Sequence, residues 1–142
     1  MDDLYRTKIK TPLYPYEFFE NLYKESTSQF ILVSYNDEIV GGSCCVTLPN
    51  KGVYEWFACG KDGLYKNIYP SSVTKHAGMK FASDNNYPLF DMMGAGKPDE
   101  KYGVRDFKAE FGGELVEHGR YLCVLNKCLY NLGKLGVKLL KK

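Results

Sequence analysis

The residues of this 142-residue chain that could carry out chemistry gather between residues 90 and 113. An apolar run over residues 87–93 predicts a buried strand, and Gly94-Ala95-Gly96 follows it directly. A glycine-rich loop that leads from a strand into a helix commonly binds ligands in α/β proteins, because N–H groups of the loop and helix converge there. A short helix is predicted over residues 102–111, ended by paired glycines. Lys108, inside this helix, is our first functional candidate.

Two charged residues of this stretch have a structural and a functional interpretation. Asp91 stands in an apolar strand, where an unpaired acid would cost several kcal/mol. It therefore either accepts hydrogen bonds from the loop near residues 94–96 or takes part in the chemistry. Lys108 is either a surface lysine whose stem packs on apolar neighbours or a catalytic cation.

Other types of site are not supported by the residue patterns. Residues 94–97 resemble a phosphate loop but lack its first glycine and its Ser or Thr. His76 and His118 are far apart in the sequence, with no carboxylate at ligand spacing, so we expect no metal site. No Cys-His signature of a nucleophile surrounds three further candidates, Cys59, Cys123 and Cys128.

The composition indicates an ordinary globular protein. Hydrophobic residues make up 44% and charged residues 25%, and the net charge of +2 is too small to indicate nucleic-acid binding. Five cysteines, an odd number, are typical of free thiols in a reducing compartment. No signal peptide and no apolar run long enough to span a membrane is visible. We therefore expect a soluble, cytoplasmic protein.

Periodicity and turn residues predict the elements that position these residues. After a leader with a short strand near residues 8–10, an aromatic helix should bury Tyr16, Phe19 and Tyr23. In order, we expect a helix at 15–25, strands at 30–35, 38–48 and 53–59, a helix at 70–84 with Val73, Ala77 and Phe81 buried, the strand at 87–93, the helix at 102–111, a hairpin of 114–117 with 121–125, and a helix at 129–140.

This order of elements predicts an α/β fold with one mixed sheet flanked by helices. Strand–helix–strand order makes the strand at 87–93 parallel to the strand at 53–59 through a right-handed crossover. A mixed sheet that splays between its two parallel strands, with a cleft at the splay, is the architecture of the GNAT acyltransferases. We expect residues 1–142 to form a single domain of this kind.

Residues 69–72, 87–94 and 103–113 resemble the C-terminal signature of the FemAB/FemX peptidyltransferases and of related single-domain GNAT-type acyltransferases. The most specific piece is Phe107-Lys108 with Phe111-Gly112-Gly113, after a strand that ends in Asp91 and Gly94. Such enzymes transfer amino acids from aminoacyl-tRNA to the peptide stem of a bacterial peptidoglycan precursor. The resemblance implies that Phe107 and Lys108 line the catalytic cleft and that Lys108 stabilises the tetrahedral oxyanion.

The resemblance also bears on the acyl donor. Acetyl-CoA-dependent GNAT domains usually carry an Arg/Gln-x-x-Gly-x-Gly/Ala loop after the third strand, and residues 60–69 lack it. We therefore expect aminoacyl-tRNA as the donor, with acetyl-CoA as the alternative, an amine-bearing acceptor such as a peptidoglycan precursor, and no further cofactor. For the site we expect Lys108, Phe107 and Asp91 as catalytic residues, and as substrate-binding residues Trp56, Glu55, Tyr69, Gly94, Gly96 and Tyr102.

One departure from the Fem pattern leaves three alternatives open. Fem proteins usually have two GNAT-like domains, whereas this chain has the length of one. A second copy could supply the missing wall in a homodimer, the substrate could differ, or the domain could be a non-catalytic binding module.

Overall fold

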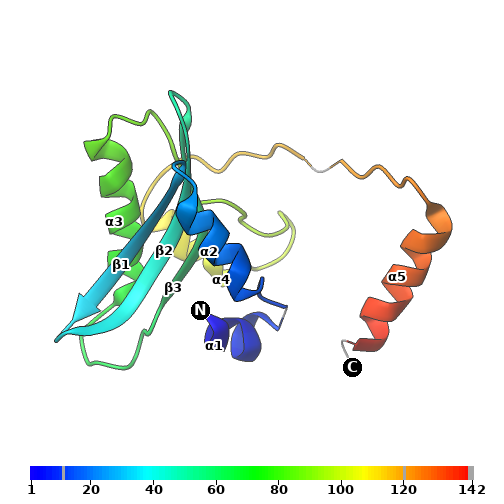
Figure 1. Ribbon diagram of the computed structural model, residues 1–142, viewed down its shortest axis with the longest axis horizontal. Coiled ribbons are helices and arrows are strands. Elements are labelled where there is room, and N and C mark those ends of the chain that lie inside the picture. The colour runs from blue at the N-terminus through cyan, green and yellow to red at the C-terminus, as the bar shows by residue number, and fades with distance from the viewer. Residues whose placement is uncertain (11, 120, 141–142) are drawn as a thin grey trace. The chain divides into compact units, whose positions relative to one another are not determined.

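The computed structural model describes residues 1–10, 12–119 and 121–140, which form a mixed α/β structure. The chain divides into two units, residues 1–110 and 111–142. The first unit contains a four-stranded mixed sheet with helices packed against it, and the second contains the last helix, α5 (Lys127–Leu140) (Figure 1). The predicted mixed sheet flanked by helices is confirmed. The assignment of residues 1–142 to one domain stays a prediction.

The sheet begins with an antiparallel meander of three strands, β1 (Ser28–Tyr35), β2 (Glu38–Leu48) and β3 (Gly52–Gly60). Asn36 and Asp37, between β1 and β2, both have positive φ, as a tight two-residue hairpin requires. The fourth strand, β4 (Phe90–Asp91), is parallel to β3 and completes the order β1-β2-β3-β4. The predicted meander and parallel crossover are confirmed.

Strands β3 and β4 part after a short contact. They pair at two positions only, Val53 with Phe90 and Tyr54 with Asp91, although β3 continues well beyond them. The Asp91 carboxylate accepts the Met93 N–H at 2.6 Å, and Met93 has a φ of 60°, so the chain turns away from the sheet. The strand predicted over 87–93 is therefore much shorter, and the parallel strands separate as expected.

Helix α3 (Pro70–Asp84) covers one face of the sheet (Figure 1). Proline stands at its first position, where the missing N–H costs nothing. Of the buried face predicted at Val73, Ala77 and Phe81, Phe81 packs against the core and Ala77 is partly buried, whereas Val73 is 48% exposed and its predicted burial is wrong. The residues of α3 that are fully buried are Pro70, Thr74, Lys75, Gly78 and Ala82. Because two of them are polar, the apolar pattern alone does not mark this face.

A β-bulge in β3 allows Glu55 to contact α3 while Phe57, two residues later, packs on α2 (Tyr16–Lys24). Two adjacent residues of β2 pair with Glu55 and Phe57, so Trp56 is an extra residue in the strand. A bulge of this kind changes which face the following side chains occupy. Phe57 accordingly packs on α2, where its ring centroid lies 5.1 Å from that of Phe19.

The aromatic face predicted for α2 is only partly inside. Phe18 and Phe19 are partly buried and lie edge to face at 5.3 Å. Tyr16 and Tyr23 are 78% and 72% exposed, so the prediction that they belong to the core is wrong. Helix α2 meets the sheet through β1 and the Phe57 region, a contact too narrow to cover its whole aromatic side.

Two predictions near the chain ends are also wrong. Residues 8–10 do not form a strand, because α1 (Asp2–Leu4) leads into a π-helical turn, η1 (Tyr5–Ile9). The described residues of 114–117 and 121–125 form no hairpin, and an isolated two-stranded hairpin is only marginally stable without a sheet to join.

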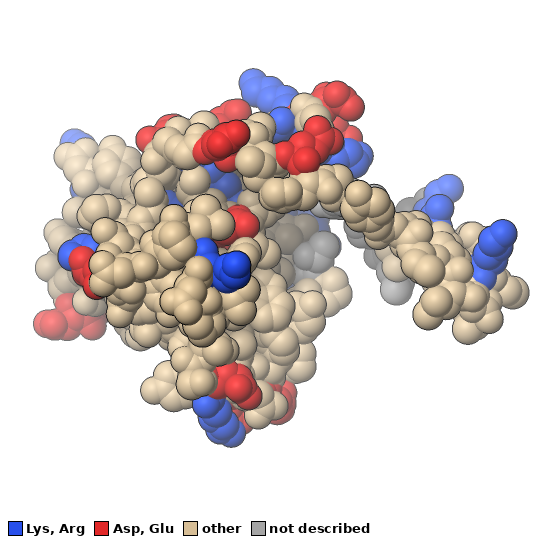
Figure 2. All heavy atoms as spheres, turned by 90° about the horizontal axis from the view of Figure 1, so that it is seen from above, with Lys and Arg blue, Asp and Glu red and all other residues tan. Residues whose placement is uncertain are grey.

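The helix predicted over 129–140 is present as α5 and begins at Lys127. Residues 127–140 include lysines and no acidic residue, and Figure 2 shows lysine side chains on this helix. Within the described part of the chain, no helix is both long and apolar enough to cross a bilayer.

We expect Gly78→Ala to destabilise the protein. A Cβ at this position would lie 2.9 Å from Cζ of Phe90, so the ring on β4 would have to move. Alanine improves helix propensity by about 1 kcal/mol. Overpacking a filled core costs about 1–3 kcal/mol, so the free energy of unfolding should fall. Urea unfolding followed by fluorescence of the single tryptophan, Trp56, measures this change.

Gly103→Ala is the control, because a Cβ there meets nothing within 4 Å. It should leave the free energy of unfolding unchanged or slightly higher. A Gly78→Ala protein as stable as this control would contradict the close packing of α3 on β4.

Candidate active site

Lys108 is carried by α4 (Gly103–Ala109), the short helix that follows the glycine loop. The Arg105 guanidinium donates hydrogen bonds to the carbonyls of Lys97 and Pro98, at 2.9 and 3.1 Å. These bonds join the charged turn before the helix to the helix itself. They orient α4 so that Lys108 reaches the end of β4.

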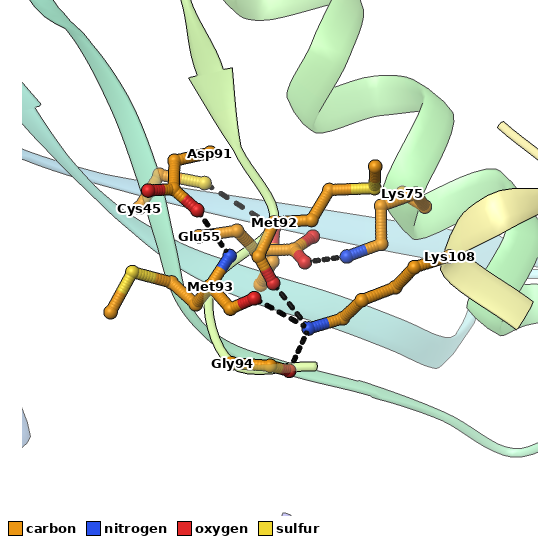
Figure 3. Close-up of polar contacts among 9 residues, drawn as sticks. Cys45, Glu55, Lys75, Asp91, Met92, Met93, Gly94 and Lys108 are labelled. Atoms are coloured by element: carbon orange, nitrogen blue, oxygen red, sulfur yellow. Dashed lines mark hydrogen bonds and ion pairs between the residues drawn. The ribbon is translucent and has the colours of Figure 1, made fainter. Parts of the chain in front are cut away.

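The Lys108 ammonium binds the backbone carbonyls directly after β4 (Figure 3). Its Nζ donates to the carbonyl oxygens of Met92, of Met93 at 3.4 Å and of Gly94 at 2.8 Å. An ammonium has three N–H donors, so every donor of Lys108 has a backbone carbonyl in reach. The side chain therefore ties α4 to the segment where β4 leaves the sheet.

Burial and one carboxylate act in opposite directions on the pKa of Lys108. Burial lowers its pKa, and the negative charge of Asp91 acts in the opposite direction. The same Asp91 carboxylate accepts the Met93 N–H, so it acts as a backbone acceptor at the turn. Asp91, Gly94 and Lys108 are thus brought together, whereas a catalytic role for Asp91 stays a prediction.

A buried ion pair lies beside this cluster. Lys75 of α3 donates to Glu55 Oε2 of β3, and the two side chains are 4% and 2% exposed (Figure 3). The second carboxylate oxygen of Glu55 is buried and accepts no hydrogen bond from the described residues. Burial, followed by the positive charge of Lys108, lowers the pKa of Lys75 to about 8. Glu55, expected to bind substrate, is therefore enclosed beneath α3.

Lys75 was not among the residues predicted from the sequence. It stands three residues before Gly78 and seven before Ala82, so all three share a helix face. A lysine on the same face as a close-packed glycine is the signal that could have identified it. The apolar pattern hides this signal, because lysines are rarely buried unless they are paired.

Trp56 and Tyr69 lie among other contacts. The Trp56 ring is stacked on Phe57 at 5.5 Å and lies edge to face with Phe18 at 5.6 Å, so it belongs to the aromatic cluster of α2. Tyr69 is 64% exposed and directly precedes α3. Neither has a described contact with Lys108, and their substrate-binding roles stay predictions.

The remaining predicted residues frame the loop before α4. Gly96 has a φ of 75°, and a Cβ there would lie 2.6 Å from Cδ1 of Tyr102, so the loop backbone packs on this ring. The Tyr102 carbonyl accepts the Arg105 N–H at 2.9 Å and begins the helix. Phe107, next to Lys108, is partly buried. Their roles in binding or catalysis stay predictions.

A cavity of about 600 Å³ lies in another part of the first unit, between the N-terminal residues and the strands β1 to β3. Neither Asp91 nor Lys108 lines it. In residues 1–10, 12–119 and 121–140, no group of three His, Cys, Asp or Glu side chains could hold a metal ion.

Comparisons with known proteins concern the family and the fold. The FemAB family matches residues 18–138. Two crystal structures of the aminoglycoside acetyltransferase meta-AAC0020 from an uncultured soil metagenomic sample, with trehalose and with sisomicin, superpose with TM-scores of 0.59 and 0.60 at 17% identity. Each alignment covers 87% of this chain and 83% of the other. No curated protein matches the chain.

The solved structures show a GNAT-like fold, as expected from the order of the elements. The family match spans most of the chain and includes the predicted motif of Phe107, Lys108 and the glycines at 112–113. The chain belongs to the FemAB family.

Proposed function

We propose that this protein transfers an aminoacyl group to an amine acceptor, with Lys108 stabilising the oxyanion. The family and the fold support an acyltransferase-type activity. The observation that carries the finer proposal is the position of the Lys108 ammonium, at the point where β3 and β4 part. The donor we favour is aminoacyl-tRNA, and the acceptor class includes peptidoglycan precursors.

The proposed reaction needs a positive donor and no covalent intermediate. The acceptor nitrogen forms a bond to the ester carbonyl carbon, and the electron pair of the C=O bond moves to oxygen. The tetrahedral oxyanion then expels the ribose oxygen, which takes up a proton while the former amine loses one. Lys108 would donate a hydrogen bond to the oxyanion, the species whose stabilisation gives the largest rate effect.

Lys108 would have to exchange one of its present bonds to do this. Its contact with the Met93 carbonyl is the longest, at 3.4 Å, and lies near the limit of a hydrogen bond. The contact with Gly94, at 2.8 Å, is of ordinary strength. The donor that faces Met93 is thus the one that could turn to a substrate oxygen at the least cost.

One observation favours a second function, that of a non-catalytic module. All three donors of Lys108 have protein acceptors, which is what a purely structural tie requires. In that case Lys108 only holds α4 on β4, and the domain binds a ligand without transferring a group to it.

The contacts of Asp62 bear on the choice of donor. Its carboxylate accepts the Ser71 N–H at 3.0 Å and the Ser71 hydroxyl, and therefore lies at the N-terminus of α3. A helix N-terminus attracts anions such as the pyrophosphate of CoA. Here an acidic side chain of the protein holds that position, which supports a donor other than acetyl-CoA.

Replacing Lys108 tests the catalytic role. Lys108→Met should lower kcat/KM for aminoacyl transfer by about 100- to 1000-fold, because one oxyanion donor is lost. Lys108→Arg keeps the charge and should retain more activity. Transfer of a labelled amino acid from aminoacyl-tRNA to peptide amines measures the rate, and circular dichroism checks the fold. A folded Lys108→Met protein with the wild-type rate would disprove the role, and a wild type inactive with every donor would favour the non-catalytic module.

The rate should also depend on the protonation of Lys108. The ammonium must keep its proton, so kcat/KM should fall as the pH rises through its lowered pKa. Asp91→Asn removes the charge that raises this pKa and should move the fall to lower pH. Lys108→Arg should abolish it, because a guanidinium stays protonated. An alkaline fall that is the same in all three proteins would show that another group titrates.

Acetyl-CoA should not stabilise the wild-type protein against thermal unfolding, because Asp62 occupies the helix terminus. Asp62→Ala should itself lower the free energy of unfolding by about 0.5–2 kcal/mol through loss of the cap. Differential scanning fluorimetry with and without acetyl-CoA measures both effects as shifts in Tm. A clear rise of the wild-type Tm with acetyl-CoA would instead support a CoA-dependent acyltransferase.

A further inference from the structure

Helix α5 has two sharply different faces. Lys127, Asn131, Lys134 and Lys138 follow one another at helical spacing and form a narrow polar stripe. The other side is a broad apolar face formed by Leu129, Leu132, Leu135 and Leu139, which the other described residues of the second unit leave exposed. Tyr130 lies beside the stripe, with Lys134 Nζ 5.5 Å from its ring centroid.

The charge of this part of the chain has a single sign. Residues 118–142 contain six of the 19 basic residues and none of the 17 acidic ones. The first 117 residues therefore hold 13 basic and 17 acidic side chains and carry the opposite net charge. Such an asymmetry between parts of a chain is typical of proteins that bind a polyanionic surface.

The helix also lacks intrinsic stability. Gly133 and Gly136 lie in its interior, and a Cβ at either position would meet nothing within 4 Å in the described structure. Interior glycines disfavour a helix, and a 14-residue helix is marginal by itself in water. We therefore expect α5 to gain its stability from the surface on which its leucines are buried.

We propose that α5 docks on an anionic lipid surface, with its leucines at the boundary between headgroups and acyl chains and its lysines toward the lipid phosphates. A basic amphipathic helix with an apolar leucine side and a flanking aromatic residue is suited to this position. A second copy packed on the leucines would leave the lysine stripe without a partner of opposite charge on α5, because residues 118–142 contain no acidic residue, which disfavours a second copy as the occupant. A nucleic acid would leave the leucine face uncovered. This docking is independent of the transfer reaction.

Sedimentation of the full chain with vesicles tests the docking. The protein should bind vesicles of equimolar phosphatidylglycerol and phosphatidylcholine, and bind phosphatidylcholine alone far more weakly. Lys134→Glu with Lys138→Glu should weaken binding by about tenfold or more, since each basic residue near an anionic surface contributes substantially. Lys51→Glu with Lys66→Glu makes the same change in charge at exposed positions of the first unit and should bind like the wild type.

The apolar face needs its own variant. Leu132→Ser with Leu135→Ser should abolish vesicle binding, whereas Asn131→Ser, on the polar stripe, should leave it unchanged. Circular dichroism should show more helix when anionic vesicles are added to the wild type, and this gain should vanish in the leucine variant. Fluorescence of Trp56, in the first unit, checks that every variant remains folded.

Three results would overturn the proposal. Equal binding to both kinds of vesicle, or none, would exclude recognition of anionic lipid. Binding unaffected by the α5 variants would place the lipid site elsewhere. A dimer in sedimentation equilibrium without lipid, dissociated by the leucine variant, would make α5 a subunit interface instead.

Discussion

The ion pair between Glu55 and Lys75 is the constraint on which the first unit depends. It joins β3 to α3 with both side chains almost completely buried. Removing one partner of such a pair typically costs about 3–5 kcal/mol, because the other charge is left alone in the interior. The pair therefore fixes the position of α3 along β3. In that position Gly78 packs closely on the Phe90 ring of β4, and this contact helps to keep β4 paired with β3.

The pair also determines the electrostatics of the candidate site. The Glu55 charge is taken up by Lys75, so Lys108 has to find its own compensation in Asp91 and in three carbonyl dipoles. The two positive charges of the lysines therefore equal the two negative charges of the carboxylates in the absence of substrate. An oxyanion would thus be stabilised by a directed hydrogen bond from Lys108 more than by an excess of positive charge. The positive charge of Lys108 in turn contributes to the lowered pKa of Lys75.

The sequence allowed the backbone of this fold to be predicted better than its buried faces. Asn36-Asp37 and Pro70 are local signals with a defined conformation, and the hairpin and the helix start were found through them. Lys108 stood out as a candidate because its helix lies between a glycine loop and paired glycines and because Phe107-Lys108 resembles the FemAB motif, and its catalytic role stays a prediction. Lys75 was missed because its burial depends on a partner 20 residues away, and the one local signal, a close-packed glycine on the same helix face, does not identify that partner. The prediction of a hairpin after residue 113 was wrong for a related reason. Its two strands would need a sheet to join, and the local sequence of 114–125 does not show whether one is available.

The parting of β3 and β4 explains why a lysine stands at this point. Because β4 pairs at only two positions, the carbonyls of Met92, Met93 and Gly94 lie beyond the ladder and need donors from elsewhere. Three successive carbonyls at the end of a strand suit an ammonium, whose three donors diverge, better than the planar fork of a guanidinium. The separation of the strands leaves these carbonyls without strand partners, and Lys108 supplies the hydrogen bonds that they lack. A substrate oxygen that entered there would compete for these donors, and the long bond to Met93 would be the first to yield.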